Sequence, residues 1–218
     1  MGFKRGDHVC AIYSTKAELA REVATFVEEG LQSGERCWYV AAGNEMDSVR
    51  AAMVELGIDV AAETARGALR LVSGQGAYVV HGSFNPETTL QIFNDAIEQA
   101  YRNGFTGFRA AADMSWALDC EDAGHQVIVY EALLKSLFAS CRATGLCLYD
   151  RTRMPLSLLD GALRTHPIAG SPRPYATNPF YDADFRSLAP GADSDVRARL
   201  AQFDRSGHTA QGPFRPHG

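Results

Sequence analysis

Apolar residues recur along the chain in two patterns, short unbroken runs and stretches with helical spacing, and the two patterns alternate. The clearest unit opens the chain, with an apolar run at 8–13, a helical stretch, and a second apolar run at 37–42. Thr15 and Glu18 have the spacing of a capping box, which predicts that the helix begins there. Gly34 predicts its end, because glycine adopts the left-handed conformation that closes helices. Both strands are apolar throughout, which is typical of a parallel sheet with helices on both faces.

The same alternation continues to about residue 165. Further strands are predicted at 68–72, 105–112 and 146–150, and the glycine-rich segment 73–86 predicts a loop at the edge of the sheet. The helices between the strands are delimited by residues that favour helix ends, namely Asn44, Gly57, Pro86, Gly145 and Pro155. Five strands that alternate with helices predict an α/β fold. The expected architecture is a three-layer αβα sandwich with a mainly parallel sheet of five strands or slightly more.

The composition changes near residue 170, where proline, aspartate and small residues become frequent. We therefore expect one α/β domain over 1–170, an extended segment over 171–205 that packs on it, and a disordered tail over 206–218. The segment has aromatic residues that would anchor it, namely Tyr175, Phe180, Tyr181 and Phe185. Its end has apolar residues at helical spacing, which predict one short amphipathic helix with Val196, Leu200 and Phe203 on one face.

Length and charge exclude several classes of protein. The chain has 218 residues and a net charge of -5, and its basic residues are scattered rather than clustered. Direct binding to nucleic acid is therefore not expected. No apolar run is long enough to cross a bilayer, and the first residues lack the apolar core of a signal peptide, so a cytoplasmic protein without membrane contact is expected. A homodimer is expected only because homodimers are common.

The cysteines and histidines do not predict a metal site. The chain has five cysteines, and none of them has CxxC or CxxH spacing. Cys10, Cys37 and Cys147 lie in predicted strands as small core residues, whereas Cys120 is the cysteine expected to be accessible. The histidines His81, His125 and His166 are too dispersed in sequence to suggest ligation. We therefore predict no metal and no cofactor.

Ligands of open parallel sheets bind beyond the carboxyl ends of the strands. The residues that follow these ends are the candidate site. They are Tyr13, Ser14, Thr15 and Lys16 after the first strand, Asp113, Met114 and Trp116 after the fourth, and Arg151 after the fifth. Met114 and Trp116 would form an apolar wall beside polar groups, the mixture that a small-molecule pocket needs. The alternative is that both pack in the core, and that Arg151 is a solvated loop residue instead of a ligand for an acidic group.

The turn after the first strand argues against a phosphate-binding loop. Such a loop requires the pattern GxxxxGK[ST], and glycine is absent from residues 7–29. Lys16 and the start of the helix could still hold one anion. Asp113 follows its strand as a Walker B carboxylate would, but a loop hydrogen bond is an equally simple role. No Ser/His/Asp order and no GxSxG elbow indicate a hydrolase.

Several segments in order resemble one known family. GDHVCAIYS, GERCWYV, FRAAADMSW, and LYD with ALRTHP are similar to the MEDS domain, the methanogen/methylotroph DcmR sensory domain, over about residues 5–170. The resemblance implies a RecA-like, P-loop-like fold without the nucleotide loop. It also implies that the domain senses small, apolar or hydrocarbon-derived ligands, often beside a histidine kinase or a DNA-binding domain. The family signature corresponds to His8, Cys10 and Tyr13, although an imidazole that bridges to neighbouring backbone would explain His8 without a ligand.

These observations lead to one functional hypothesis and two alternatives. The hypothesis is a non-catalytic domain of bacterial regulation that senses a small molecule and signals through contact with a regulatory protein, a kinase or a transcription regulator. The C-terminal extension would report the bound state. The first alternative is a degenerate nucleotide-binding protein. The second is an interaction module without a ligand, in which Tyr13 and Trp116 are sealed in the core.

Overall fold

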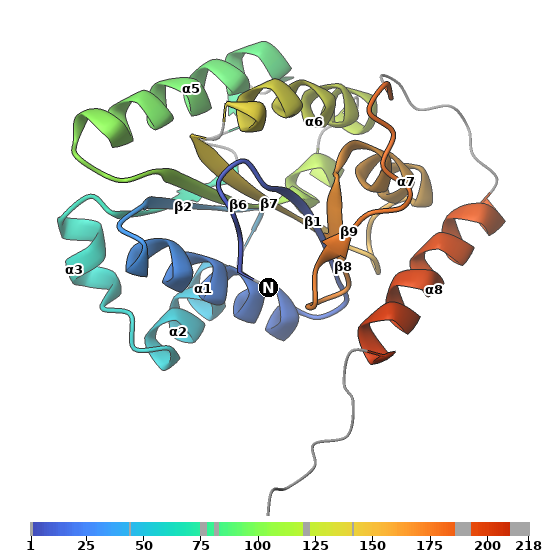
Figure 1. Cartoon of the computed structure of the whole chain (residues 1–218), viewed down its shortest axis with the longest axis horizontal. Coiled ribbons are helices and arrows are strands. Elements are labelled where there is room, and N and C mark those ends of the chain that lie inside the picture. The colour runs from blue at the N-terminus through green and yellow to red at the C-terminus, as the bar shows by residue number, and fades with distance from the viewer. Residues whose placement is uncertain are drawn as a thin grey trace, which may run out of the picture.

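The computed structural model describes residues 2–43, 45–74, 78–80, 83–119, 123–140, 142–185 and 193–209. Within these ranges a twisted sheet lies between two layers of helices (Figure 1). The sheet has seven strands in the order β3 (Leu69–Ser73), β2 (Arg36–Ala41), β6 (Phe108–Asp113), β7 (Ala143–Asp150), β1 (His8–Tyr13), β8 (Ile168–Gly170), β9 (Ala176–Thr177). All neighbouring strands are parallel except β8 and β9. The predicted α/β class with a mainly parallel sheet is confirmed.

Each face of the sheet has its own hydrophobic core, because successive strand residues point to opposite faces. The helices α1 (Lys16–Gln32), α2 (Met46–Glu55) and α3 (Val60–Ala65) cover one face, and α5 (Pro86–Arg102), α6 (Ala123–Ala139) and α7 (Leu156–Thr165) cover the other (Figure 1). In β1, Val9 and Ala11 belong to the core under α1, whereas Cys10 and Ile12 belong to the core under α6 and α7. A strand buried on both faces therefore has no polar alternation in its sequence.

The helix ends follow the predicted signals. Thr15 caps α1 in a full capping box with Glu18. Gly34 follows α1 with φ at 73°, the left-handed conformation that a side chain would strain. Asn85 caps α5 and Pro86 occupies its first turn.

The predictions differ from the structure at several elements. The segment 73–86 contains two short antiparallel strands, β4 (Val79–Val80) and β5 (Ser83–Phe84), where a loop is predicted. The prediction that Gly145 ends a helix is wrong, because Gly145 lies within β7. The ring of Phe138 lies against Gly145 so closely that a side chain would overlap it. The glycine therefore allows close packing of α6 on β7, and the strand begins three residues earlier than predicted.

The C-terminal part is more regular than predicted. After α7 the chain adds the unpredicted strands β8 and β9 to the sheet, whereas the helix predicted around Val196 and Leu200 is present as α8 (Asp193–Thr209), with both residues buried. The segment 171–205 thus contains the short strand β9 and most of α8, which continues to Thr209. Predictions for Asn44, His81, Cys120 and 210–218 lie outside the described residues.

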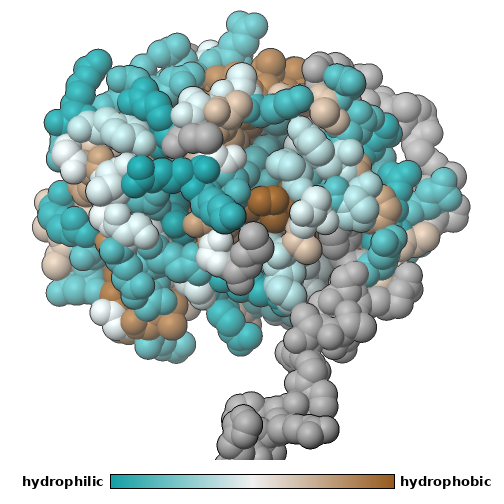
Figure 2. Space-filling view, in the orientation of Figure 1, coloured by the Kyte–Doolittle hydropathy of each residue, from teal (hydrophilic) through white to brown (hydrophobic). Residues whose placement is uncertain are grey.

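The face shown in Figure 2 is mainly hydrophilic, with small and separate apolar patches. None of the helices in the described ranges combines the length and the apolar character that a membrane span requires.

Candidate functional site

The carboxyl ends of β1, β6 and β7 lie side by side, as predicted, and bring Tyr13 and Asp113 together. The Tyr13 hydroxyl donates to Asp113 Oδ1 at 3.2 Å and lies 3.2 Å from Ser115 Oγ. The backbone N–H of Ser115 donates to the same Asp113 oxygen at 3.0 Å. Ser115 was not among the candidate site residues predicted from the sequence. Together these three residues form one hydrogen-bonded network at the edge of the sheet.

This network is closed to solvent. Asp113 is 1% exposed and Tyr13 is 4% exposed. Burial raises the pKa of the Asp113 carboxyl, although the hydrogen bonds from Ser115 act in the opposite direction. Burial also raises the pKa of the Tyr13 phenol, and the nearby Asp113 raises it further. Tyr13 therefore acts as a neutral donor to Asp113.

Met114 and Trp116 begin the short 3₁₀ helix η1 (Met114–Asp119) and are buried in the core. The indole of Trp116 stacks on the ring of Tyr78, with 4.6 Å between the centroids and 9° between the planes. The predicted open apolar wall is therefore not formed by these two residues. Core packing, the alternative considered for them, describes their position in the structure.

The carboxylate of Glu18, a residue of α1 itself, lies at the N-terminus of this helix. The backbone N–H groups of Ser14 and Thr15 donate to Glu18 Oε2 at 2.7 and 3.2 Å. Lys16 Nζ lies 3.2 Å from Glu45 Oε1. A carboxylate thus occupies the position where the predicted anion site needs free N–H groups, and a second carboxylate neutralises Lys16.

Arg151 follows β7 and joins the sheet to α8. Its Nη1 and Nη2 donate to the two carboxylate oxygens of Asp204, at 2.9 and 3.2 Å. The predicted ligand for an acidic group is therefore bound to an acidic group of the chain itself. This bidentate geometry fixes the orientation of the planar guanidinium.

A small apolar cavity lies between the sheet and the helices α5 and α6. Its volume is about 20 Å³, room for about one water molecule. Apart from Phe108 of β6, the sheet contributes small residues, and the helices and Tyr78 contribute large ones. The lining residues are Tyr78, Phe93, Phe108, Ala110, Ala112, Tyr130, Leu134, Leu137, Phe138, Ala143, Gly145 and Cys147. The wall is thus almost wholly apolar, and the prediction from the strand ends did not find it.

Comparison with known families identifies the domain. The profile of the family described as "MEDS: MEthanogen/methylotroph, DcmR Sensory domain" matches residues 7–167. The chain belongs to the MEDS family. This confirms the resemblance found in the sequence and suggests a sensory role. No curated protein matches the chain significantly in sequence.

Solved structures similar to this MEDS domain share its fold. A KaiC-like protein from the archaeon Pyrococcus horikoshii superposes with a TM-score of 0.56 at 16% identity, covering 77% of this chain and 71% of that protein. The flagellar accessory protein FlaH from Methanocaldococcus jannaschii gives a TM-score of 0.54 at 14% identity, with the same coverages. At these identities the likeness shows the RecA-like fold alone.

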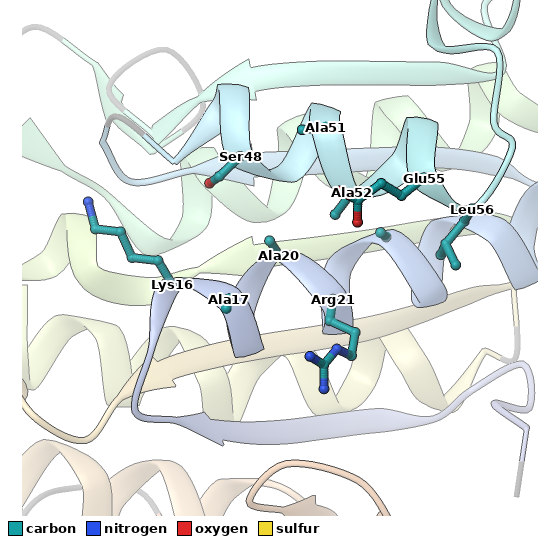
Figure 3. A pocket seen from close by; sticks show the side chains of 10 residues that line it. Lys16, Ala17, Ala20, Arg21, Ser48, Ala51, Ala52, Glu55 and Leu56 are labelled. Atoms are coloured by element: carbon teal, nitrogen blue, oxygen red, sulfur yellow. The ribbon is translucent and has the colours of Figure 1, made fainter.

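A groove on the surface of the MEDS domain runs between α1 and α2 (Figure 3). It has a volume of about 540 Å³ and opens to solvent. Small residues dominate its lining, which consists of Lys16, Ala17, Ala20, Arg21, Ala24, Ser48, Ala51, Ala52, Glu55 and Leu56. In Figure 3, Arg21 points away from α2. The groove therefore lacks polar groups that converge on one point, which specific recognition of a small molecule needs.

His8, the signature histidine of the MEDS domain, is buried on the α6 side of the sheet. Its Nε2 lies 3.1 Å from Glu131 Oε2, so its partner is a side chain and not neighbouring backbone. Burial lowers the pKa of His8 to about 3. The ring of His166 lies 3.8 Å from the ring of His8 between centroids. His166 is distant from His8 in sequence but lies beside it in the fold, because β8, which follows His166, pairs with β1.

Proposed function

We propose that this MEDS domain senses a small apolar molecule that binds in the cavity between the sheet and the helices α5 and α6. The observation that carries the proposal is the lining of this cavity. It combines small residues on the strands, such as Ala110 and Ala112, with aromatic and aliphatic residues on the helices. Apolar surface of this kind favours an apolar ligand, because binding removes it from water without breaking hydrogen bonds.

The size of the cavity couples binding to movement. A volume of about 20 Å³ holds no organic molecule unless a wall moves. The wall is formed largely by α6, through Tyr130, Leu134 and Phe138. A ligand therefore binds only the state in which α6 has shifted. Because it binds this state more tightly than the other, it raises the population of the shifted state.

The helices beyond α6 offer a route for this movement to the surface. Lys135 of α6 donates to the carbonyl oxygen of Ala183 at 3.1 Å, and α6 packs on α7. The helix α8 packs on α7 and is joined to it by an ion pair between Arg199 and Asp160. Arg151 also binds α8, through an ion pair with Asp204. A regulatory partner, a kinase or a transcription regulator, would read the position of α8.

We also propose that the domain binds no nucleotide and catalyses no reaction. Its support is the start of α1, where Glu18 accepts from the N–H groups of Ser14 and Thr15. A phosphate placed there would meet this carboxylate and the carboxylate of Glu45, which pairs with Lys16. A magnesium-dependent thermal stabilisation by ATP would argue instead for the degenerate nucleotide-binding alternative.

Benzene is a suitable probe for the cavity. We expect saturable shifts of the amide resonances of Ala110, Ala112 and Cys147 when benzene is titrated into the full chain. Leu134→Ala enlarges the cavity, so it should tighten benzene binding at least several-fold while destabilising the fold by about 2–5 kcal/mol. NMR titration and denaturant unfolding measure the two effects.

Leu19→Ala is the matched control. Leu19 is fully buried in the core on the other face of the sheet. This substitution should cost a similar free energy of unfolding and leave benzene binding unchanged. The proposal is wrong if neither the wild type nor Leu134→Ala shows saturable shifts at the cavity, or if Leu19→Ala tightens binding equally.

A further inference from the structure

Four side chains with metal-ligating atoms meet in the core between the sheet, α6 and α7. They are His8 on β1, Glu131 on α6, Cys147 on β7 and His166 directly after α7. The ligating atoms all lie within 4.8 Å of one another, and all four residues are buried. Residues that are 158 positions apart in sequence, such as His8 and His166, converge here because β1 and β7 are neighbours and α7 packs on α6.

The hydrogen bond of His166 fixes which nitrogen faces the cluster. Nδ1 lies 2.7 Å from the carbonyl oxygen of Ala162, which can only accept, so Nδ1 carries the hydrogen. In the neutral ring Nε2 then has a lone pair. Nε2 lies 3.4 Å from Glu131 Oε2 and has no hydrogen-bond partner among the described residues. When Glu131 is a carboxylate, its Oε2 and the Nε2 of His166 present two electron pairs to each other, an arrangement that a cation would stabilise.

The charge of the cluster also calls for a cation. Glu131 is 0% exposed, and the side chains that the structure places around its carboxyl are His8, His166, Cys147 and Tyr149, none of which is a lysine or an arginine. A buried carboxylate without a positive partner is costly.

We propose that His8, Glu131, Cys147 and His166 bind one Zn²⁺ ion. A tetrahedral zinc ion with bonds of about 2.0 Å to nitrogen or oxygen and 2.3 Å to sulfur separates its ligand atoms by about 3.3–3.8 Å. Glu131 Oε2 lies 3.1 Å from His8 Nε2, 3.6 Å from Cys147 Sγ and 3.4 Å from His166 Nε2. Cys147 Sγ lies 3.6 Å from His8 Nε2. Small side-chain movements therefore complete the coordination, and the thiol proton of Cys147 leaves to solvent as zinc binds.

Two of the four ligands, Glu131 and His166, are held by neighbouring groups as ligands are in zinc sites. The Tyr149 hydroxyl donates to Glu131 Oε1 at 2.6 Å, which leaves Oε2 for the ion. The carbonyl of Ala162 orients His166 in the same way. With one carboxylate and one thiolate, a Zn²⁺ complex is neutral overall, and burial of a neutral complex avoids the cost of a buried charge.

This inference goes beyond the proposed sensing of an apolar molecule, since zinc binding needs only these four side chains. The ion would join β1, β7, α6 and the end of α7 in one cluster. Cys147 also lines the apolar cavity, so the ion would lie at its wall. Benzene binding to the metal-free protein tests the cavity alone, which keeps the two proposals separable.

Titration of the full chain after treatment with a chelator tests the site. We expect one Zn²⁺ per chain in competition with a chromophoric chelator. Co²⁺ in place of Zn²⁺ should give the intense visible bands of a tetrahedral site and a thiolate-to-cobalt charge-transfer band. Cys147→Ser should abolish this band and weaken Zn²⁺ binding by at least about 10–100-fold, and His166→Gln should weaken it similarly.

Cys37→Ser is the matched control, because Cys37 is equally buried but belongs to the core on the other face. It should retain both the stoichiometry and the charge-transfer band. If Cys147→Ser does not fold, anomalous diffraction at the zinc edge on wild-type crystals locates the ion directly. The proposal is overturned if the wild type binds no stoichiometric Zn²⁺, if the thiolate band survives in folded Cys147→Ser, or if the anomalous peak lies elsewhere.

Discussion

Buried hydroxyl groups differ in how much they stabilise the fold, and two tyrosines on the same face of the sheet, Tyr13 and Tyr39, illustrate the difference. The Tyr13 hydroxyl donates to Asp113, whereas the Tyr39 hydroxyl has no hydrogen-bond partner within the described chain. Both rings are buried. The value of a buried hydroxyl depends on its partner, because removal of one partner leaves the other unsatisfied.

We therefore predict opposite outcomes for two identical substitutions. Tyr13→Phe removes one of the two donors to Asp113 Oδ1, so that only the Ser115 N–H remains, and should lower the free energy of unfolding by about 1–3 kcal/mol. Tyr39→Phe removes an unpaired polar group and should be neutral or slightly stabilising. Urea denaturation of the two variants and the wild type measures both effects. Equal losses would show that the bond between Tyr13 and Asp113 contributes nothing to stability.

Asp113 predicts a pH dependence of stability. Because burial raises the pKa of its carboxyl above the ordinary value of 3.8, the folded state binds more protons than the unfolded state as pH rises above that value. The contribution of Asp113 to stability therefore falls as pH rises through the interval between 3.8 and the raised pKa. Asparagine does not titrate, so Asp113→Asn lacks this pH-dependent contribution to the free energy of unfolding. The free energy of unfolding of Asp113→Asn minus that of the wild type should increase with pH across this interval, and a flat difference would contradict the prediction.

Local signals specify the helices and strands of this protein better than they specify the contacts between them. The capping box of Thr15 and Glu18 and the Asn85–Pro86 start of α5 were predictable, because the chemistry of a helix end lies within four residues. Gly145 was assigned to a helix end, since sequence does not distinguish a glycine that closes a helix from one that admits a ring. The ring of Phe138 comes from seven residues earlier in the chain, and only the packing of α6 on β7 brings it there.

The candidate sites follow the same rule. The pair of Tyr13 and Asp113 was predictable, because the ends of parallel strands meet at one edge. The apolar cavity and the cluster of His8 with His166 were not. They depend on which strand side faces α6 and on the return of the chain after α7, neither of which is fixed by local spacing.

Gly145 provides a prediction about the packing of two elements. Gly145→Ala places a methyl group against Phe138 and should destabilise the fold by about 1–3 kcal/mol. Phe138→Leu in the same chain gives the methyl group room, so the double variant should lose less than the sum of the two single losses. Thermal or urea unfolding of the four chains completes the cycle. Strict additivity would mean that the two side chains do not compete for space.

At the scale of the whole molecule, the sheet divides the protein into two cores that share no side chains. Leu134 and the proposed zinc ligands belong to the α5–α7 side, whereas Leu19 and Cys37 belong to the α1–α3 side. The cavity, the cluster and the contacts of α7 with α8 all lie on one side. The proposed sensing therefore involves only half of the folded chain.

This division has a consequence for how the protein tolerates change. Because the two cores share no side chains, the losses in the free energy of unfolding caused by Leu19→Ala and Leu134→Ala should add to within about 0.5 kcal/mol in the double variant. Sequence variation on the two sides should then accumulate independently. Chemical denaturation of the double variant tests this, and a deviation above about 1 kcal/mol would show that the backbone of the sheet transmits strain. If the losses add, residues of the α1–α3 side can be substituted without changing the packing of the opposite side, and the α5–α7 side can acquire new ligand specificities independently.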